Sequence, residues 1–336
     1  MVSHADILAS NALLNDATAP RVAVFVGGTS GIGKLTLQAL VATGASTRIY
    51  MVGRKSSAER TQPFIDELRA LNPRADIIWT EAEYSLLAET RRISREILAK
   101  EPRIDLLFLT AGYAPMFSDR AETEEGVEIT QSLAYYSRIL FIQHLLPALK
   151  AVSDAPGRVI SVLGGGLESA SSLKVDDIDL KQPANFGGPK AQAHYLCLNT
   201  VALDKIAEEN PDVVFVHAWP GWVNTGNVHR GVKEGTVWAW VVKWLLAPLI
   251  GAVSIRDETA AQRYLFEATS AHYGGGGVVW KGKAGVNVKG EEGKNGLFLV
   301  NFRANCTPNL KVVSALREKA RAKVWEHTME VLAPYL

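Results

Sequence analysis

The sequence has little of several features that define whole classes of protein. Its 336 residues include two cysteines, Cys197 and Cys306, too few for the disulfide framework of a small secreted domain. Lysine and arginine exceed aspartate and glutamate by a single charge, so the composition predicts no surface for nucleic acid. We therefore expect a globular protein of a reducing compartment, with a cytoplasmic location.

Long apolar runs are also missing. The most apolar stretch, VWAWVVKWLLAPLIGAV at 237–253, contains Lys243 and Pro248 and is shorter than the ~20 residues that cross a bilayer. Residues 1–20 have no basic start and no continuous apolar segment, which argues against a signal peptide. We expect no stable membrane span, a short helix within 1–20, and either a buried or a superficially membrane-attached role for 237–253.

Strand-like and helix-like patterns alternate from residue 21 to 221. Apolar runs such as RVAVFV, TRIYMV and IDLLFL predict buried strands, and helical periodicity follows each of them. A long helix is predicted over about 122–151, a seventh strand at GLFLVNF and a last helix from about 309 to 332. This alternation predicts an α/β fold: a three-layer, Rossmann-type, doubly wound parallel sheet of about seven strands with helices on both faces.

The domain organisation follows from the same pattern. Residues 1–20 form an N-terminal helical extension, and 21–336 form a single domain. Within that domain we expect an apolar insertion at about 224–256 and a C-terminal extension at about 273–336. We expect no metal site.

The stretch GGTSGIG lies between the first predicted strand and its helix. Gly27, Gly31 and Gly33 allow a tight turn and let the backbone approach a diphosphate, and the helix N-terminus adds free N–H groups. A glycine-rich turn with no ligand would give the same spacing. The strand-turn-helix context favours cofactor binding.

The second predicted strand ends in VGR. An acidic residue there would bind the ribose hydroxyls of NAD, but this chain has Arg54 and Lys55. A guanidinium suits a 2′-phosphate, so the sequence favours NADP(H). The alternative is a solvated basic turn.

Five motifs carry a resemblance to a known family. VFVGGTSGIG, IYMVGR, RVISVLGGG and KAQAHYLCLNT, followed by PGWVNTG, resemble the short-chain dehydrogenase/reductase (SDR) family over residues 22–225. The likeness is strongest to SDR-like proteins of filamentous fungi, many of which serve secondary-metabolite pathways. The resemblance implies that Thr29, Ser30 and Ile32 line the diphosphate turn, Glu83 lies near the adenine, Ala111 and Gly112 end the fourth strand, Pro220 and Gly221 begin the loop over the nicotinamide, and Val223 and Thr225 hold its carboxamide.

The family's usual catalytic set is Asn-Ser-Tyr-Lys, in which lysine binds the ribose and lowers the pKa of the tyrosine. The resemblance puts Ala134 at the asparagine position and Phe186 at the tyrosine position, and it leaves Lys190 in place. The serine position falls on Leu163 or Gly164. If this segment is helical, Phe186 and Lys190 share one face.

A second register remains open, in which Lys190 takes the tyrosine position and His194 the lysine position. Pro189 favours the first register, because proline fits the first turn of a helix. Tyr113, which follows the TAG sequence at the end of a strand, is the best substitute acid. His194 either contacts the substrate or is a buried structural histidine.

The predicted insertion is rich in tryptophan, including Trp222 and Trp238. With Phe186 and His194, these side chains predict contacts to a bulky apolar substrate. A dimer interface or a core helix would have the same composition, and a homodimer is compatible with the family.

Three functions remain open. The first is an NADP(H)-dependent oxidoreductase that acts on a bulky apolar ketone, alcohol or activated alkene of secondary metabolism, with the usual Asn-Ser-Tyr groups replaced. The second is a non-redox cyclase, isomerase or dehydratase, because orientation alone can supply much of a barrier. The third is a nucleotide-binding protein without turnover.

Overall fold

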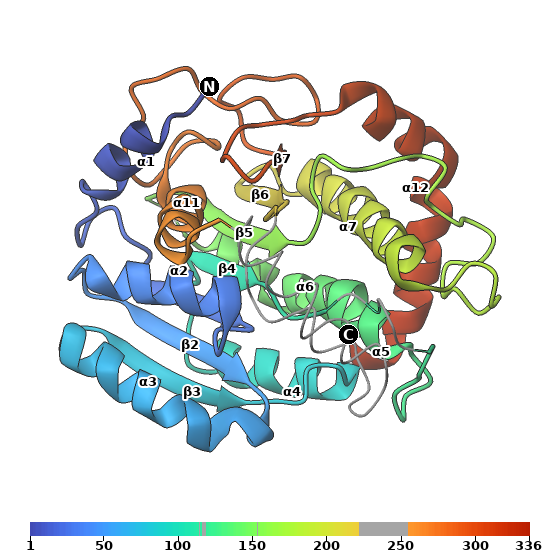
Figure 1. The fold of residues 1–336 in the computed structure, drawn as a ribbon, viewed down its shortest axis with the longest axis horizontal. Helices are drawn as coiled ribbons and strands as arrows, with labels where there is room; N and C mark the ends of the chain where they lie inside the picture. The colour runs from blue at the N-terminus through green and yellow to red at the C-terminus, as the bar shows by residue number, and fades with distance from the viewer. Residues whose placement is uncertain (114, 116–118, 153, 222–254) are drawn as a thin grey trace.

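The computed structural model describes residues 1–113, 115, 119–152, 154–221 and 255–336 (Figure 1). Its centre is a sheet of seven parallel strands in the order β3-β2-β1-β4-β5-β6-β7. The predicted fold class is confirmed. The strands are β1 (Val22–Val26), β2 (Arg48–Gly53), β3 (Asp76–Glu81), β4 (Leu106–Leu109), β5 (Gly157–Val162), β6 (Val213–Ala218) and β7 (Leu297–Val300).

The strands are largely apolar because both faces of the sheet are covered; exceptions include Asp76 and Glu81 at the ends of β3 and the buried Arg158 in β5. All five residues of β1 are buried, and successive side chains point to opposite faces. Val24 belongs to the core cluster on one face and Phe25 to the cluster on the other. A parallel sheet of this kind requires continuous apolar runs rather than alternation.

One face is covered by α2 (Gly31–Ala42), α3 (Ala58–Leu71) and α11 (Asp257–Thr269). Figure 1 shows α2 and α11 side by side, with the N-terminal helix α1 (His4–Asn11) next to α11. The Asn11 amide donates to the Gln262 carbonyl at 2.8 Å and fastens α1 to the domain. The helix α1 spans only part of the predicted 1–20 extension, and α11 was not predicted.

The other face is covered by α4 (Leu87–Leu98), α6 (Ser137–Lys150) and α7 (Gly188–Glu209), and α12 (Leu310–Leu332) packs along α7 (Figure 1). The last helix agrees with its prediction to within a residue. A short 3-10 turn, η4 (Ala333–Tyr335), follows it.

The predicted helix over about 122–151 is wrong at its beginning. Glu122 and Glu128 form an antiparallel bridge, so this stretch is a turn. The Glu128 carboxylate then accepts the Gln131 N–H at 2.6 Å and caps the helix. The helix runs through α5 (Ile129–Gln131), a π-helical turn η2 (Ser132–Tyr136) and α6.

Most of the predicted insertion at 224–256 lies outside the described residues, and so does the apolar stretch 237–253. Among the helices that the structure describes, none combines the length and apolarity needed to cross a bilayer.

Candidate functional site

The parallel sheet places the loops after its strands at one edge. From β1 the chain moves outward through β2 and β3, then returns to the opposite side of β1 with β4. Ligands of such sheets bind at this switch point, outside the carboxyl ends of the strands. Apart from Lys190, which lies in α7 (Gly188–Glu209), the predicted cofactor residues that the structure describes follow β1, β2, β3, β4 and β6, so the fold gathers them at this edge.

The glycine loop after β1 is close-packed. Gly27 and Gly31 have φ angles of +98° and +55°, which side chains rarely adopt. A Cβ on Gly33 would lie 2.5 Å from the Gly27 carbonyl oxygen and 2.7 Å from the Thr110 hydroxyl. Only glycine fits there, so the loop turns tightly into α2.

The first turn of α2 lies at the same edge. Ser30 is its N-cap residue in an extended conformation, and Thr29 and Ser30 are half-buried. Ile32 is 7% exposed and packs in the core, which anchors the turn. The first N–H groups of a helix lack partners within it and favour an anion, so this turn suits a diphosphate.

Arg54 follows β2 directly, and Lys55 begins a 3-10 turn, η1 (Lys55–Ser57). Both are exposed, and neither has a salt-bridge partner among the described residues. A Cβ on Gly53 would lie 2.8 Å from the Thr29 methyl group, so the end of β2 packs against the glycine loop. Two cations that have no salt-bridge partner in the described part of the chain therefore lie beside that loop.

Glu83 follows β3 on the outer side of the sheet. Its side chain is exposed, and its carboxylate accepts the Ser85 hydroxyl at 2.9 Å. It is therefore open to solvent at the edge where the resemblance expects the adenine.

The segment after β4 passes over β1. The Thr110 and Ala111 N–H groups both donate to the Val26 carbonyl, at 2.9 and 3.1 Å, and Gly112 has φ +138°. The next residue, Tyr113, is half-buried. Burial is the main reason that the pKa of its phenol is raised; the Glu128 charge adds to this and Arg54 opposes it. The phenol is protonated at neutral pH.

Arg138 lies beneath this segment and was missed by sequence reasoning. It is 2% exposed, and its guanidinium donates to the Ala111 carbonyl at 2.7 Å, the Ser161 hydroxyl at 2.8 Å and the Val162 carbonyl at 2.9 Å. Burial lowers its pKa to about 9, which still leaves it charged at neutral pH. It joins the carboxyl ends of β4 and β5.

The serine position of the family carries no hydroxyl, whether it falls on Leu163 or Gly164. A Cβ on Gly164 would lie 3.0 Å from the Leu196 side chain, so a serine needs Leu196 to move. The Gly164 N–H donates to Nε2 of His217 at 3.2 Å. Packing and this hydrogen bond together hold the loop after β5.

His217 belongs to a buried chain of polar groups. Its Nδ1 lies 2.8 Å from the Thr200 hydroxyl, which donates to the Glu168 carboxylate at 2.8 Å. Burial, followed by the nearby charge of Arg138, lowers the pKa of His217 to about 3, so the ring is neutral. Burial raises the pKa of Glu168. No pattern in the sequence predicted this series of hydrogen-bonded groups.

The helix α7 begins later than the predicted pairing of Phe186 and Lys190 requires. Gly187 has φ +134° and precedes the first helical residue, Gly188. Phe186 is therefore not helical, and the predicted shared face is absent. Pro189 does lie in the first turn, as predicted, while Lys190 is exposed and its ammonium donates to the Ala184 carbonyl at 3.2 Å.

His194 has a structural position. It is fully buried, its Nδ1 accepts the Lys174 N–H at 3.1 Å, and its Nε2 lies 2.9 Å from the Ile178 carbonyl. Both ring nitrogens are used within the protein, which favours the structural alternative over a substrate contact. Tyr195 is also buried and donates to the Glu128 carboxylate at 3.0 Å.

Residues after His194 form the part of α7 that lies beside the ends of the strands. Leu196 packs against Gly164, and the Asn199 amide donates to the Ala134 carbonyl at 2.7 Å. Asn199 also accepts the Ser161 hydroxyl at 3.2 Å. Lys190 is six residues before Leu196, about 9 Å along the helix axis. The Lys190 side chain therefore leaves the helix well beyond the ends of the strands.

The loop after β6 begins with Pro220 and Gly221, both half-buried. Gly221 has φ +64°, and a Cβ there would lie 2.8 Å from the Phe302 side chain, which itself follows β7. Trp219 and Phe302 meet edge-to-face with centroids 5.4 Å apart. The predicted cofactor residues Val223 and Thr225 and the predicted substrate residues Trp222 and Trp238 lie outside the described residues.

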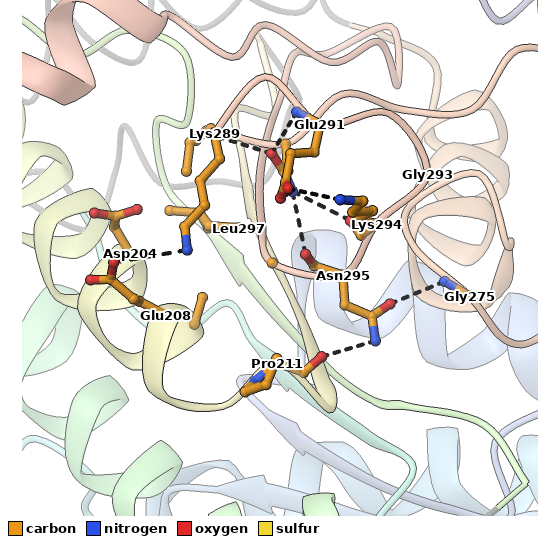
Figure 2. Close-up of a pocket in the computed structure, with 14 residues that line it drawn as sticks. Asp204, Glu208, Pro211, Gly275, Lys289, Glu291, Gly293, Lys294, Asn295 and Leu297 are labelled. Atoms are coloured by element: carbon orange, nitrogen blue, oxygen red, sulfur yellow. Dashed lines mark hydrogen bonds and ion pairs between the residues drawn. The ribbon is translucent and has the colours of Figure 1, made fainter.

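A separate cavity of about 490 Å³ lies at the opposite edge of the sheet, near the first residues of β6 and β7 (Figure 2). Its charged side chains are paired: Lys289 with Glu208 at 3.8 Å, and Lys294 with Glu291 at 3.1 Å. It contains none of the predicted site residues. Within the described part of the chain, no group of three or more His, Cys, Asp or Glu side chains is arranged to hold a metal ion.

The chain is similar to proteins of known class. A family model described as short chain dehydrogenase matches residues 21–167. Oxidoreductase AN1596 from Emericella nidulans is 37% identical, over 99% of this chain and 98% of its own. Short-chain dehydrogenase/reductase SAT2 from Stachybotrys chartarum is 28% identical, over 93% and 91%. The solved Pseudomonas aeruginosa RhlG/NADP active-site complex is similar in fold, with a TM-score of 0.54, 24% identity, and coverage of 76% of this chain and 92% of that one.

Proposed function

Because the chain belongs to the short-chain dehydrogenase/reductase family, we propose that this oxidoreductase uses NADP(H) to act on a bulky apolar ketone, alcohol or activated alkene. The observation that carries the proposal is the close-packed glycine loop at the switch point, with the unpaired Arg54 beside it. The loop suits a diphosphate and the guanidinium suits a 2′-phosphate.

The residues that would hold the cofactor lie along the carboxyl edge of the sheet. The glycine loop and the first turn of α2 would bind the diphosphate, and Arg54 with Lys55 the 2′-phosphate. When bound, NADP(H) supplies or accepts a hydride. The adenine side would be flanked by Glu83, and the nicotinamide side by Ala111, Gly112, Pro220 and Gly221, with Val223 and Thr225 following in the chain.

The source of the proton distinguishes this chain from the usual catalytic set. Ala134, Gly164 and Phe186 carry no acidic proton, and Lys190 donates to a backbone carbonyl. Tyr113 is the nearest candidate in sequence to the carboxyl end of β4, and its raised pKa makes it a weak acid. Protonation would come from Tyr113, from water or from the substrate's own hydroxyl.

This chemistry favours an activated alkene among the three substrate classes. A carbonyl oxygen that receives a hydride needs an acid nearby, whereas a carbon atom next to an activating group can be protonated from solvent. The bulky apolar character rests on Trp222 and Trp238. The relatives from filamentous fungi fit a secondary metabolite.

Isothermal titration with NADPH and NADH tests the cofactor. We expect NADPH to bind more tightly, and Arg54→Asp to weaken NADPH binding by about tenfold or more. NADH binding should be unchanged or tighter in this variant, because an acidic residue there can bind the ribose hydroxyls. Arg95→Asp is the matched control, because Arg95 is exposed on α4, away from this edge. No heat from either dinucleotide, or a preference for NADH, would refute the proposal.

Turnover separates the redox function from the non-redox alternative. Loss of NADPH absorbance with apolar enones and ketones supports an oxidoreductase acting on that class. Conversion of a substrate with the cofactor omitted would support a cyclase, isomerase or dehydratase instead. Positions 134, 164 and 186 lack the Asn, Ser and Tyr side chains that are usual in the family. This loss is the reason for considering a non-redox function for this chain.

A further inference from the structure

Arg138 is a buried cation with no carboxylate partner among the described residues. Its guanidinium makes hydrogen bonds to three backbone carbonyls, those of Leu133, Ala111 and Val162, and to the Ser161 hydroxyl. Buried charges are ordinarily paired, because a lone ion in the interior loses its hydration. Dipoles solvate this cation, and its formal charge is not cancelled.

The buried polar groups around it do not supply a neighbouring anion. Ser161 donates onward to Asn199, which is neutral. His217, opposite Ser161 on β6, is held neutral by burial and by the Arg138 charge itself. The carboxylate of Glu168 is reached only beyond His217 and Thr200.

The position of this charge within the fold is specific. Nη2 of Arg138 lies 2.7 Å from the Ala111 carbonyl oxygen, and a Cβ built on Gly112 would lie 3.6 Å from the same nitrogen. The guanidinium is therefore one backbone layer beneath the segment that follows β4. In a doubly wound sheet one half of a dinucleotide lies on each side of the switch point, and the glycine loop and Arg54 mark the adenosine half. The nicotinamide half belongs on the side of β4 and β5.

We propose that Arg138 sets the preference of the site for the reduced cofactor, because its uncancelled charge repels the positively charged ring of NADP⁺ and not the neutral ring of NADPH. The inference rests on the proposed function. It deepens that function, since a site that binds NADPH more tightly than NADP⁺ is suited to reduction.

The size of the effect follows from Coulomb's law. Two unit charges about 8 Å apart, at an effective dielectric constant of about 20, change a binding constant by roughly 10- to 30-fold. Salt screens such a buried charge little. We therefore expect wild-type protein to bind NADPH at least about tenfold more tightly than NADP⁺.

Two substitutions separate the charge from the hydrogen bonds. Arg138→Met removes both, and Arg138→Gln removes the charge while keeping part of the bonds. We expect both variants to reduce the ratio of the two dissociation constants by about tenfold. A merely structural role would change the ratio in Arg138→Met but not in Arg138→Gln, or in neither.

The experiment is calorimetric titration of each protein with NADPH, NADP⁺ and 2′-phospho-ADP-ribose. The third ligand carries no nicotinamide, so its affinity reports the folding of the adenosine half and should be the same in all three proteins. Equal wild-type affinities for NADPH and NADP⁺, or a ratio that follows hydrogen bonding rather than charge, would overturn the inference and leave the proposed function standing. Failure of all three ligands to bind the wild-type protein would overturn both.

If Arg138→Met does not fold, the wild-type ratio and the Arg138→Gln ratio still decide the matter. The wild-type protein should favour NADPH by about tenfold or more, and Arg138→Gln should bind the two forms about equally. A wild-type ratio near one, or an unchanged ratio in Arg138→Gln, contradicts the inference.

Discussion

Replacement of Gly33 by alanine tests the central feature of the site. The added methyl group would lie 2.5 Å from the Gly27 carbonyl oxygen and 2.7 Å from the Thr110 hydroxyl, closer than carbon atoms in proteins approach such groups. The Thr110 hydroxyl can rotate away, but the Gly27 carbonyl is part of the loop backbone. The loop must therefore open, and its N–H groups must move.

The expected cost has two parts. Overpacking of a close contact destabilises a protein by about 1–3 kcal/mol. Displacement of the diphosphate loop should also weaken NADPH binding by at least about 100-fold, since several charge-assisted hydrogen bonds share one geometry. A 100-fold loss in affinity corresponds to about 2.7 kcal/mol, near the upper end of the expected loss in stability.

Gly44→Ala is the matched control. Gly44 lies just after the other end of the same helix α2, with φ +74° and no heavy atom within 4 Å of an added Cβ. Alanine there is strained only by its left-handed backbone, which costs about 1–2 kcal/mol, and the loop is untouched. The two variants are thus similar in stability and differ in their distance from the site.

The assay is urea unfolding of both variants together with calorimetric titration of NADPH. Folded Gly33→Ala protein that binds NADPH as tightly as Gly44→Ala would refute the assignment of this loop to the diphosphate. Equal losses of affinity in both variants would attribute the effect to stability rather than to the loop.

Further predictions follow from single buried or displaced groups. Glu267 is buried, and one of its carboxylate oxygens has no hydrogen-bond partner among the residues that the structure describes. Burial raises its pKa well above the usual value, so it weakens the folded state as pH rises above about 4.5; Glu267→Gln should stabilise the protein by about 1 kcal/mol or more at pH 7 and flatten that pH dependence in urea unfolding. Asp204 is 2% exposed and pairs through both oxygens with Arg317 at 2.7 Å, so Asp204→Asn should cost about 3 kcal/mol, whereas Asp176→Asn, which breaks an exposed pair, should change the stability much less. Phe186→Tyr should leave turnover unchanged, because this residue precedes α7 and does not share a helix face with Lys190; a rise in carbonyl reduction would contradict the inference that position 186 lies away from the reacting carbonyl.

The strands and their order along the chain could be predicted because the strands of a parallel sheet that is covered on both faces are buried and therefore rich in apolar residues. In β1, β5 and β6 every residue is buried, and apolar residues predominate in each strand; Arg158 and Ser161 in β5 and His217 in β6 are buried polar exceptions. The parallel direction then followed from the helices between them. The site loops were predictable in position for the same reason, since each follows a recognisable strand.

Helix boundaries were less predictable because single residues decide them. The stretch before Ile129 has charged residues at helical spacing, but the Glu128 side chain caps the next helical turn by accepting the Gln131 N–H. Gly187 ends the extended segment before α7 through one left-handed backbone angle. Local periodicity contains no signal for either, and the pairing of Phe186 with Lys190 depended on the second.

The buried polar groups beneath the site could not be predicted at all, because their partners are distant in sequence. Arg138 occurs within the run SRILFIQHLLP, where an arginine indicates an exposed position on an amphipathic helix. Its burial depends on acceptors at Ala111 and Ser161, 27 and 23 residues away. Asn199 reaches Ala134 across 65 residues. The family resemblance implies hydroxyl and amide groups at positions where this chain lacks them. These positions contact a polar network that other residues form. A chain that had only lost its catalytic groups would leave these backbone carbonyls unpaired, at a cost of about 1–3 kcal/mol each, whereas here Arg138 and Asn199 bind them and the edge of the sheet remains ordered for a ligand.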